Sequence, residues 1–98
     1  MADLTTIFWR DIPAQVLAKS GRQTARVQLT DRFQEAIDAA AMRAGLIGTD
    51  EYLAQWRRQT ETCGDDLEDE ARAKADRLEA EYTDEVLAGL VRAEGAKA

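Results

Sequence analysis

The sequence predicts an α+β domain, in which an N-terminal antiparallel sheet is followed by three to four helices packed on that sheet. Up to about residue 30, strand-favouring residues are interrupted by turn residues, whereas the remainder places apolar residues at spacings of three and four. The charge divides at a similar point, since residues 1–49 carry a net +1 and residues 50–98 a net −7. A chain of 98 residues supports one core, so we expect residues 1–98 to form a single domain.

Three antiparallel strands are expected in the N-terminal third, at about residues 4–10, 14–19 and 22–29. The first of them is rich in Thr, Ile, Phe and Trp, which favour a pleated and partly buried surface. Pro13 has no backbone N–H and separates this strand from the second. The sequence leaves open whether the first strand pairs with the near or the far strand of the hairpin that the other two form.

Ser20 and Gly21 predict a two-residue hairpin turn in which Lys19 pairs with Arg22. Alternation then gives the hairpin one apolar face, made of Ala14, Val16, Ala18, Ala25 and Val27, with Leu29 following. The opposite face is mostly polar and holds Gln15, Leu17, Lys19, Arg22, Thr24, Arg26 and Gln28. A slip of one residue would mix the two sets, so the apolar face favours this register.

Two helices are expected to follow the strands. The first begins near Asp31 and ends at Gly45, and it has an apolar stripe suited to covering the sheet, formed by Phe33, Ile37, Ala40, Ala41 and Ala44. The second is capped by Thr49 and has Arg57 and Arg58 in its last turn. Residues 59–64 are expected to form a polar linker.

Two further helices complete the prediction. Asp65 is expected to cap a helix with one narrow apolar stripe, made of Leu67, Ala71, Ala75, Leu78 and Tyr82. Such a stripe fits a contact within the chain or a helix–helix contact in an oligomer. Thr83 is expected to cap a short final helix, and residues 93–98 are expected to fray.

The composition excludes several classes of chemistry. Because the chain has no histidine, it has no Ser–His–Asp or Cys–His machinery, and we expect neither enzymatic activity, nor a metal site, nor a cofactor. The net charge of −6 argues against nucleic-acid binding. A single cysteine, the lack of a signal-peptide pattern and short apolar runs favour a cytoplasmic protein that does not enter membranes.

Two features of the sequence could carry chemistry but have simpler structural explanations. Residues 65–69 match the DDxxD pattern that holds Mg²⁺ in prenyl-diphosphate enzymes, yet those enzymes need a large helical cavity, so capping of an acidic helix is favoured. Cys63 precedes a helix start, a position that can activate a thiol. The carboxylates of Glu61, Asp65 and Asp66 oppose its thiolate, so a structural role is favoured.

The sequence also indicates candidates for a partner interface. Tryptophan is common in cores but is also enriched at binding hot spots. Both faces of the first strand are partly apolar, so either helices cover both faces or one face awaits a partner. Basic residues gather on the polar sheet face or its edge, where they either bind an acidic partner or keep the sheet soluble. The candidate interface residues are Trp9, Arg10, Asp11, Arg22, Arg26 and Trp56.

Four runs of the sequence carry a family resemblance: residues 7–16 (IFWRDIPAQV), 32–38 (RFQEAID), 41–45 (AMRAG) and 63–67 (CGDDL). They resemble the small bacterial virulence factor domain family, in matching order from residue 7 to about residue 82. The resemblance implies no catalytic residues. Stand-alone members are sometimes encoded near folate- and corrinoid-dependent methyl-transfer proteins, which suggests an accessory subunit of one-carbon metabolism.

We therefore expect a non-enzymatic protein-interaction module, an accessory subunit or adaptor of a larger bacterial complex that binds a protein partner or a second copy. The alternative is a small ligand-binding or catalytic-accessory subunit linked to folate or corrinoid one-carbon metabolism. That subunit would act through side chains such as Arg10, Asp11, Asp65 and Asp66. A stoichiometric partner protein would support the first hypothesis, and a ligand bound to the purified monomer would support the second.

Overall fold

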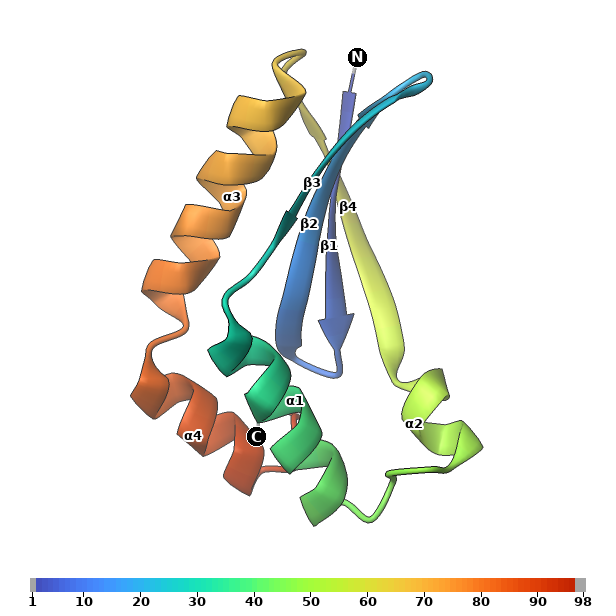
Figure 1. The fold of residues 1–98 in the computed structure, drawn as a ribbon, viewed down its shortest axis with the longest axis vertical. Coiled ribbons are helices and arrows are strands. Elements are labelled where there is room, and N and C mark those ends of the chain that lie inside the picture. Colours follow the sequence, from blue (N-terminus) through green and yellow to red (C-terminus); the bar gives the residue numbers. More distant parts are fainter. Residues whose placement is uncertain (1, 97–98) are drawn as a thin grey trace.

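The computed structural model describes residues 2–96 and confirms the α+β fold (Figure 1). One antiparallel sheet has the strand order β3-β2-β1-β4, formed by β1 (Ala2–Trp9), β2 (Ile12–Ser20), β3 (Gln23–Gln28) and β4 (Trp56–Cys63). The helices in this part of the chain are α1 (Asp31–Arg43), α2 (Asp50–Ala54), α3 (Leu67–Glu81) and α4 (Asp84–Arg92).

The three N-terminal strands form where the sequence predicts them, but the hairpin register differs. β1 pairs with β2, the near strand of the hairpin, and with β4 on its other side. Ser20 pairs with Gln23, so Gly21 and Arg22 form the turn and the predicted pairing is wrong by two residues. Because a strand repeats its faces every two residues, this error leaves each side chain on its predicted face.

β4 replaces the end of the predicted second helix and the predicted linker. The predicted second helix forms as α2 over residues 50–54, but its extension to residue 58 and the linker over residues 59–64 are wrong. β4 lies at the edge of the sheet with most of its side chains exposed, and it therefore lacks the apolar alternation of a half-buried strand. Its pairing with β1, from Cys63 opposite Ala2 to Trp56 opposite Trp9, holds it in place.

One face of the sheet is covered mainly by α3. This helix packs along β2 and β3, and its predicted apolar stripe is buried against them, at Leu67, Ala71, Ala75, Leu78 and Tyr82. α1 contacts β2 and packs against α4, so the helix that contains Phe33 and Ile37 supplies less of the cover than expected. The stripe of α3 is used within the chain and is not left over for an oligomer contact.

The predicted caps largely form. Thr49 Oγ1 accepts a hydrogen bond from the Tyr52 N–H at 3.3 Å, and Thr83 Oγ1 accepts one from the Val86 N–H at 3.2 Å. At the start of α3, Asp66 rather than Asp65 is the cap. These side chains satisfy N–H groups that the first helical turn leaves without partners.

The start of α1 is fixed by α3 instead of by its own cap. The Thr30 N–H and hydroxyl donate to the two carboxylate oxygens of Glu79, at 2.8 and 3.0 Å. Arg32 pairs with Glu79 at 3.0 Å and with Asp84 at 3.2 Å, and it donates to the Tyr82 carbonyl oxygen. Three helices are joined through this one guanidinium group.

The segment after α4 returns to the turn between β1 and β2. The Asp11 N–H donates to the Gly95 carbonyl oxygen, and Arg10 Nη1 donates to the Glu94 carbonyl oxygen, both at 2.8 Å. The tail, for which fraying is expected, is thus held at the hairpin as far as Gly95, while residues 97–98 lie outside the described chain. Within residues 2–96, no helix has the length and apolarity needed to cross a membrane.

Candidate functional site

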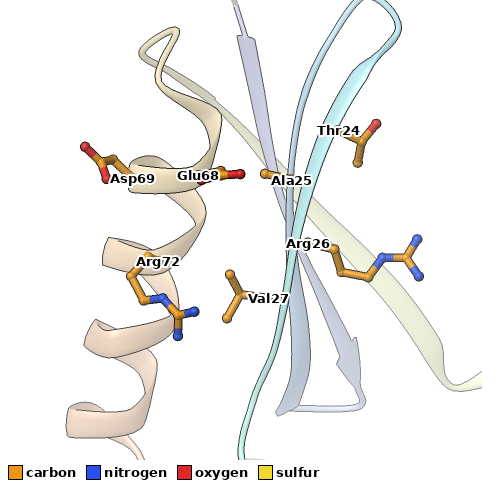
Figure 2. Close-up of a pocket in the computed structure, with 7 residues that line it drawn as sticks. All are labelled: Thr24, Ala25, Arg26, Val27, Glu68, Asp69 and Arg72. Carbon is orange, nitrogen blue, oxygen red and sulfur yellow. The ribbon is translucent and has the colours of Figure 1, made fainter.

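Among residues 2–96, no helix lies across the second face of the sheet (Figure 1). The register places Arg26 beside Leu17, Leu17 beside Thr5, and Thr5 beside Thr60, so these side chains lie on one face. In Figure 2, Ala25 and Val27 point towards α3, whereas Thr24 and Arg26 point away from it. We call this second face the open face, formed by Asp3, Thr5, Ile7, Gln15, Leu17, Lys19, Thr24, Arg26, Gln28, Arg58, Thr60 and Thr62. Trp56, which pairs with the buried Trp9, closes one end of this face beside Ile7 and Arg58 and is counted with it.

The open face is basic although the chain is acidic. Lys19, Arg26 and Arg58 are exposed, and Asp3 is the acidic residue that shares their face. Within residues 2–96 none of the three cations has an ion pair. The helices show the opposite balance, with thirteen acidic against six basic side chains. Charge is therefore segregated between the two sides of the molecule.

Two shallow depressions lie on the open face. One, of about 330 Å³, is lined by Ile7, Gln15, Trp56, Arg57 and Arg58. The other, of about 240 Å³, is lined by Thr5, Leu17, Lys19, Thr24, Arg26 and Arg58. Arg58 borders both, and the three apolar side chains of the face, at Ile7, Leu17 and Trp56, are half-buried. Apolar contact surface and guanidinium groups therefore alternate across this face.

The Trp56 ring is held in position by its neighbours. It meets Tyr52 of α2 edge-to-face, with ring centroids 6.3 Å apart and an interplanar angle of 85°. Tyr52 in turn packs against Trp9 at 5.6 Å, and its carbonyl oxygen accepts a hydrogen bond from the Trp9 indole N–H at 2.9 Å. Burial and the nearby Asp38 raise the pKa of Tyr52, so its hydroxyl stays neutral. This aromatic group gives the open face a rigid end.

The tip of the β1–β2 hairpin is internally paired. Arg10 has a positive φ of 53°, and its Nε donates to the Gln55 side chain at 3.2 Å. Arg57 forms an ion pair with Asp11 at 3.0 Å and lies over the Phe8 ring at 4.5 Å. These contacts tie β4 and α2 to the hairpin tip, which orients the strand that carries Trp56.

The predicted interface residues fall into three groups. Trp9 is 0 % exposed and belongs to the core, and Arg10 and Asp11 are engaged at the hairpin tip, so these three are not part of the open face. Arg22 is exposed in the β2–β3 turn. Arg26 and Trp56 do lie on the open face, in the two different depressions.

Sequence reasoning missed Arg58, Ile7 and Leu17 as members of this site. Arg58 was assigned to a helix, which hid its position between the two depressions. The local signal was weak, because β4 has no apolar alternation and its strand-favouring residues are Trp56, Thr60 and Thr62. Thr60 confirms the position of β4 beside β1, because its hydroxyl is 3.0 Å from that of Thr5.

Cys63 and the acidic run at residues 65–69 lie away from the open face. Burial, together with the carboxylates of Glu70, Asp3, Glu61 and Asp65, raises the pKa of the Cys63 thiol. A hydrogen bond to Asp66 and repulsion from its carboxylate raise the pKa of Asp69. Among the described residues, no group of three or more His, Cys, Asp or Glu side chains is arranged to hold a metal ion.

Comparison with known proteins identifies one family. The family model described as "Virulence factor" matches residues 7–91, a span that contains most of the sheet, α1, α2, α3 and most of α4. This confirms the resemblance seen in the sequence and extends it through most of α4. The comparison with curated proteins and the comparison with solved structures each give no significant match.

Proposed function

Starting from the fact that the chain belongs to the virulence factor domain family, we propose that it is a protein-interaction module, an accessory subunit or adaptor of a larger complex. The open face is its contact surface, and the partner surface that it binds is acidic. One observation carries this proposal: Lys19, Arg26 and Arg58 surround half-buried apolar side chains on a sheet face that no helix covers.

The composition of the open face resembles that of protein interfaces. Arginine and aromatic residues are enriched in such interfaces, and buried tryptophan and arginine side chains contribute much of the binding energy. A sheet face that only contacts water needs no apolar residues. The side chains of Ile7, Leu17 and Trp56 gain from being covered, while the three cations bordering them favour carboxylates opposite.

The groups with shifted pKa values support a role without catalysis. The residues concerned are Tyr52, Cys63, Asp69 and Glu79. Cys63 and Asp69 lie near the start of α3, Glu79 lies near its end and Tyr52 lies in α2, and each shift has a local cause in burial, hydrogen bonds or nearby charges. Catalytic sites usually gather such groups in one cleft. We accordingly propose that the protein acts by binding, in the cytoplasm, where a lone thiol stays reduced.

The proposal is tested by comparing two variants with the same change of charge. Arg26→Glu/Arg58→Glu reverses two cations of the open face, and Arg77→Glu/Arg92→Glu reverses two exposed cations of the helices. Each variant and the unaltered chain is used to capture proteins from extracts of the source cells. A protein captured in stoichiometric amount is then purified and titrated against all three.

We expect the open-face variant to bind this partner at least about tenfold more weakly, with an affinity that also falls as salt is added. The helix variant should bind within about threefold of the unaltered chain. An equal loss for both variants, or no stoichiometric partner, would refute the proposal. A small carboxylate-bearing molecule bound at the open face of the purified monomer would instead favour the ligand-binding alternative.

A further inference from the structure

β3 forms one edge of the sheet, and α3 lies beside that edge. Between them is a groove of about 510 Å³. Figure 2 shows its walls, which are four consecutive residues of β3 and three residues of α3: Thr24, Ala25, Arg26, Val27, Glu68, Asp69 and Arg72. A second depression, of about 300 Å³, shares Thr24, Ala25 and Glu68 with the first and continues the groove towards the β2–β3 turn.

The main chain of β3 has hydrogen-bonding groups that face this groove. Ser20 and Gln23 close the two-residue turn, and the Leu29 N–H donates to the Ala14 carbonyl oxygen at 3.1 Å. Main-chain groups of antiparallel strands point alternately to the two sides, so the odd-numbered residues from 23 to 29 face β2. The N–H and C=O groups of Thr24 and Arg26 consequently point to the free edge. Among residues 2–96, no turn or loop backbone pairs with these groups.

The α3 side of the groove is acidic. Asp65, Asp66, Glu68 and Asp69 line the two connected depressions, and within the described chain none of them forms an ion pair. Arg72 is the cation on the same helix that borders the groove. The raised pKa of Asp69, caused by Asp66, agrees with a crowding of carboxylates that a positive charge would relieve.

We propose that the groove binds an extended, basic segment of a partner protein, which adds to β3 as a fifth strand with its Lys or Arg side chains facing the carboxylates of α3. Peptides bind to sheet edges in this way when main-chain hydrogen bonds supply affinity and side-chain sites supply specificity. This binding mode uses the edge of the sheet and not its open face, so it does not depend on the function proposed above.

The dimensions suit a short segment. β3 has six residues, and at roughly 3.3 Å per residue it offers an edge about 20 Å long, enough for five or six residues of a partner strand. Ala25 and Val27 are small, which leaves room beside them for alternate side chains of the segment. A second copy of this chain is a poorer occupant, because its other edge strand, β4, would bring Glu61 to the groove as well as Arg57 and Arg58, and Arg57 is already paired with Asp11.

The test uses three peptides of six residues with blocked ends. The first alternates Lys and Val, the second has the same side chains with every backbone nitrogen methylated, and the third has Glu in place of Lys. Binding is followed by the NMR shifts of the labelled protein, and amide hydrogen exchange is measured with and without peptide. The variant Glu68→Gln/Asp69→Asn removes two charges from the groove, and Asp76→Asn/Glu81→Gln is the matched control on the same helix.

We expect the first peptide to bind and the other two to bind at least about tenfold more weakly, because one lacks main-chain donors and the other has the wrong charge. Exchange should slow at the amides of Thr24 and Arg26 and stay unchanged at Ala25 and Val27. The groove variant should weaken binding several-fold, while the control variant and Arg58→Glu should leave it unchanged.

Four results would overturn the proposal. They are a lack of binding by the first peptide at millimolar concentration, equal binding of the methylated peptide, unchanged exchange at Thr24 and Arg26, and an equal effect of the control variant. Protection of the two amides that rises with protein concentration in the absence of peptide would also overturn it, since a second copy would then occupy the edge. None of these results depends on whether the open face binds an acidic partner.

Discussion

Gly95 should be the most sensitive glycine of this chain to substitution, because its position depends on a contact with the core. Its φ is +91°, and a Cβ atom built on it would lie 2.8 Å from Cζ3 of the buried Trp9 ring. Its N–H donates to the Leu90 carbonyl oxygen at 2.7 Å and its carbonyl oxygen accepts from Asp11. Gly95→Ala therefore combines an unfavourable backbone conformation with a steric conflict that neither side can easily relieve.

A matched variant separates the two costs. Gly48 has a φ of +79°, and a Cβ there would meet nothing within 4 Å. An alanine in the left-handed region costs about 1–2 kcal/mol, which both variants share. Overpacking against a rigid core group adds about 1–3 kcal/mol, which applies to Gly95→Ala alone. We expect free energies of unfolding to fall by about 2–5 kcal/mol for Gly95→Ala and about 1–2 kcal/mol for Gly48→Ala.

Urea unfolding followed by far-ultraviolet circular dichroism measures these free energies. A double-mutant cycle with Trp9→Phe identifies the contact, because a smaller ring should recover at least about 1 kcal/mol of the loss caused by Gly95→Ala. Equal destabilisation by the two glycine variants would contradict the reasoning. So would a double-mutant cycle with no coupling, since the segment after α4 would then not rest on Trp9.

Three further predictions concern single side chains. Burial raises the pKa of Glu79, but hydrogen bonds from Thr30 and Arg32 outweigh this effect, so the pKa is lowered in the folded state. The stability that the ionised Glu79 carboxylate adds to the fold is therefore fully present above its pKa in the unfolded chain, and it is lost as the pH falls through its pKa in the folded chain. In chemical unfolding at pH 7, Glu79→Gln should lower the free energy of unfolding by about 2 kcal/mol, and this difference from the unaltered chain should shrink towards pH 3. The exposed Glu81→Gln should lower the free energy of unfolding by less than about 0.5 kcal/mol. The Cys63 thiol should react with iodoacetamide more slowly than free cysteine at pH 8, and a rate equal to or above that of free cysteine would contradict the raised pKa. Arg58→Glu should leave the melting temperature within about 3 °C of the unaltered chain, and a larger fall would mean that this side chain supports the fold.

The N-terminal strands could be predicted because their burial follows the period of two. Ala18 and Val16 are buried beneath α3, while their neighbour Lys19 is exposed, as the alternation indicates. The hairpin register could not be predicted from the same pattern, because a shift of two residues preserves both faces. The turn residues also allow two different turns, Ser20–Gly21 and Gly21–Arg22, because a glycine can occupy either central position of a two-residue turn. In the structure, Gly21 has a positive φ of 59° and is the first of the two.

β4 could not be predicted because no face of it is deeply buried. Its formation depends on pairing with β1, a contact between residues about fifty positions apart. The local signals around it were those of a helix, since Thr49 and the acidic residues after it do begin one. That helix ends at Ala54, after a single turn and a half, because the next residues gain more from the β1 edge than from continuing the helix.

The candidate site was only partly predictable for a related reason. From the sequence, Trp9 and Trp56 are equivalent candidates, because tryptophan is common in cores and is also enriched at binding hot spots. The structure separates them through distant chain segments: α2 and the residues around Gly95 enclose Trp9, while Trp56 keeps one side open. Which tryptophan remains accessible is decided by how the chain returns to the hairpin tip, and local sequence does not contain that information.

The two proposed surfaces meet at β3, and their charges should couple. Arg26 directs its side chain to the open face and its main chain to the free edge, and neighbouring strands lie about 4.8 Å apart. A cation of a segment paired with β3 and a carboxylate bound by Arg26 would lie on opposite sides of β3, about two strand spacings or roughly 10 Å apart. In water two opposite unit charges at this distance attract each other by about 0.4 kcal/mol, so an acidic ligand on the open face should bind about twofold more tightly when the groove is filled.

Salt provides the decisive test of this coupling. A peptide alternating Glu and Phe is titrated with and without the Lys–Val peptide, at about 10 mM and about 1 M salt, where the screening lengths are about 30 Å and about 3 Å. The enhancement should appear at low salt and vanish at high salt. Glu68→Gln/Asp69→Asn is the control for direct association of the two peptides, because it weakens binding in the groove and keeps the open face intact. Enhancement of equal size in this variant, or enhancement that persists at high salt, would show that the two surfaces are not linked by charge across β3.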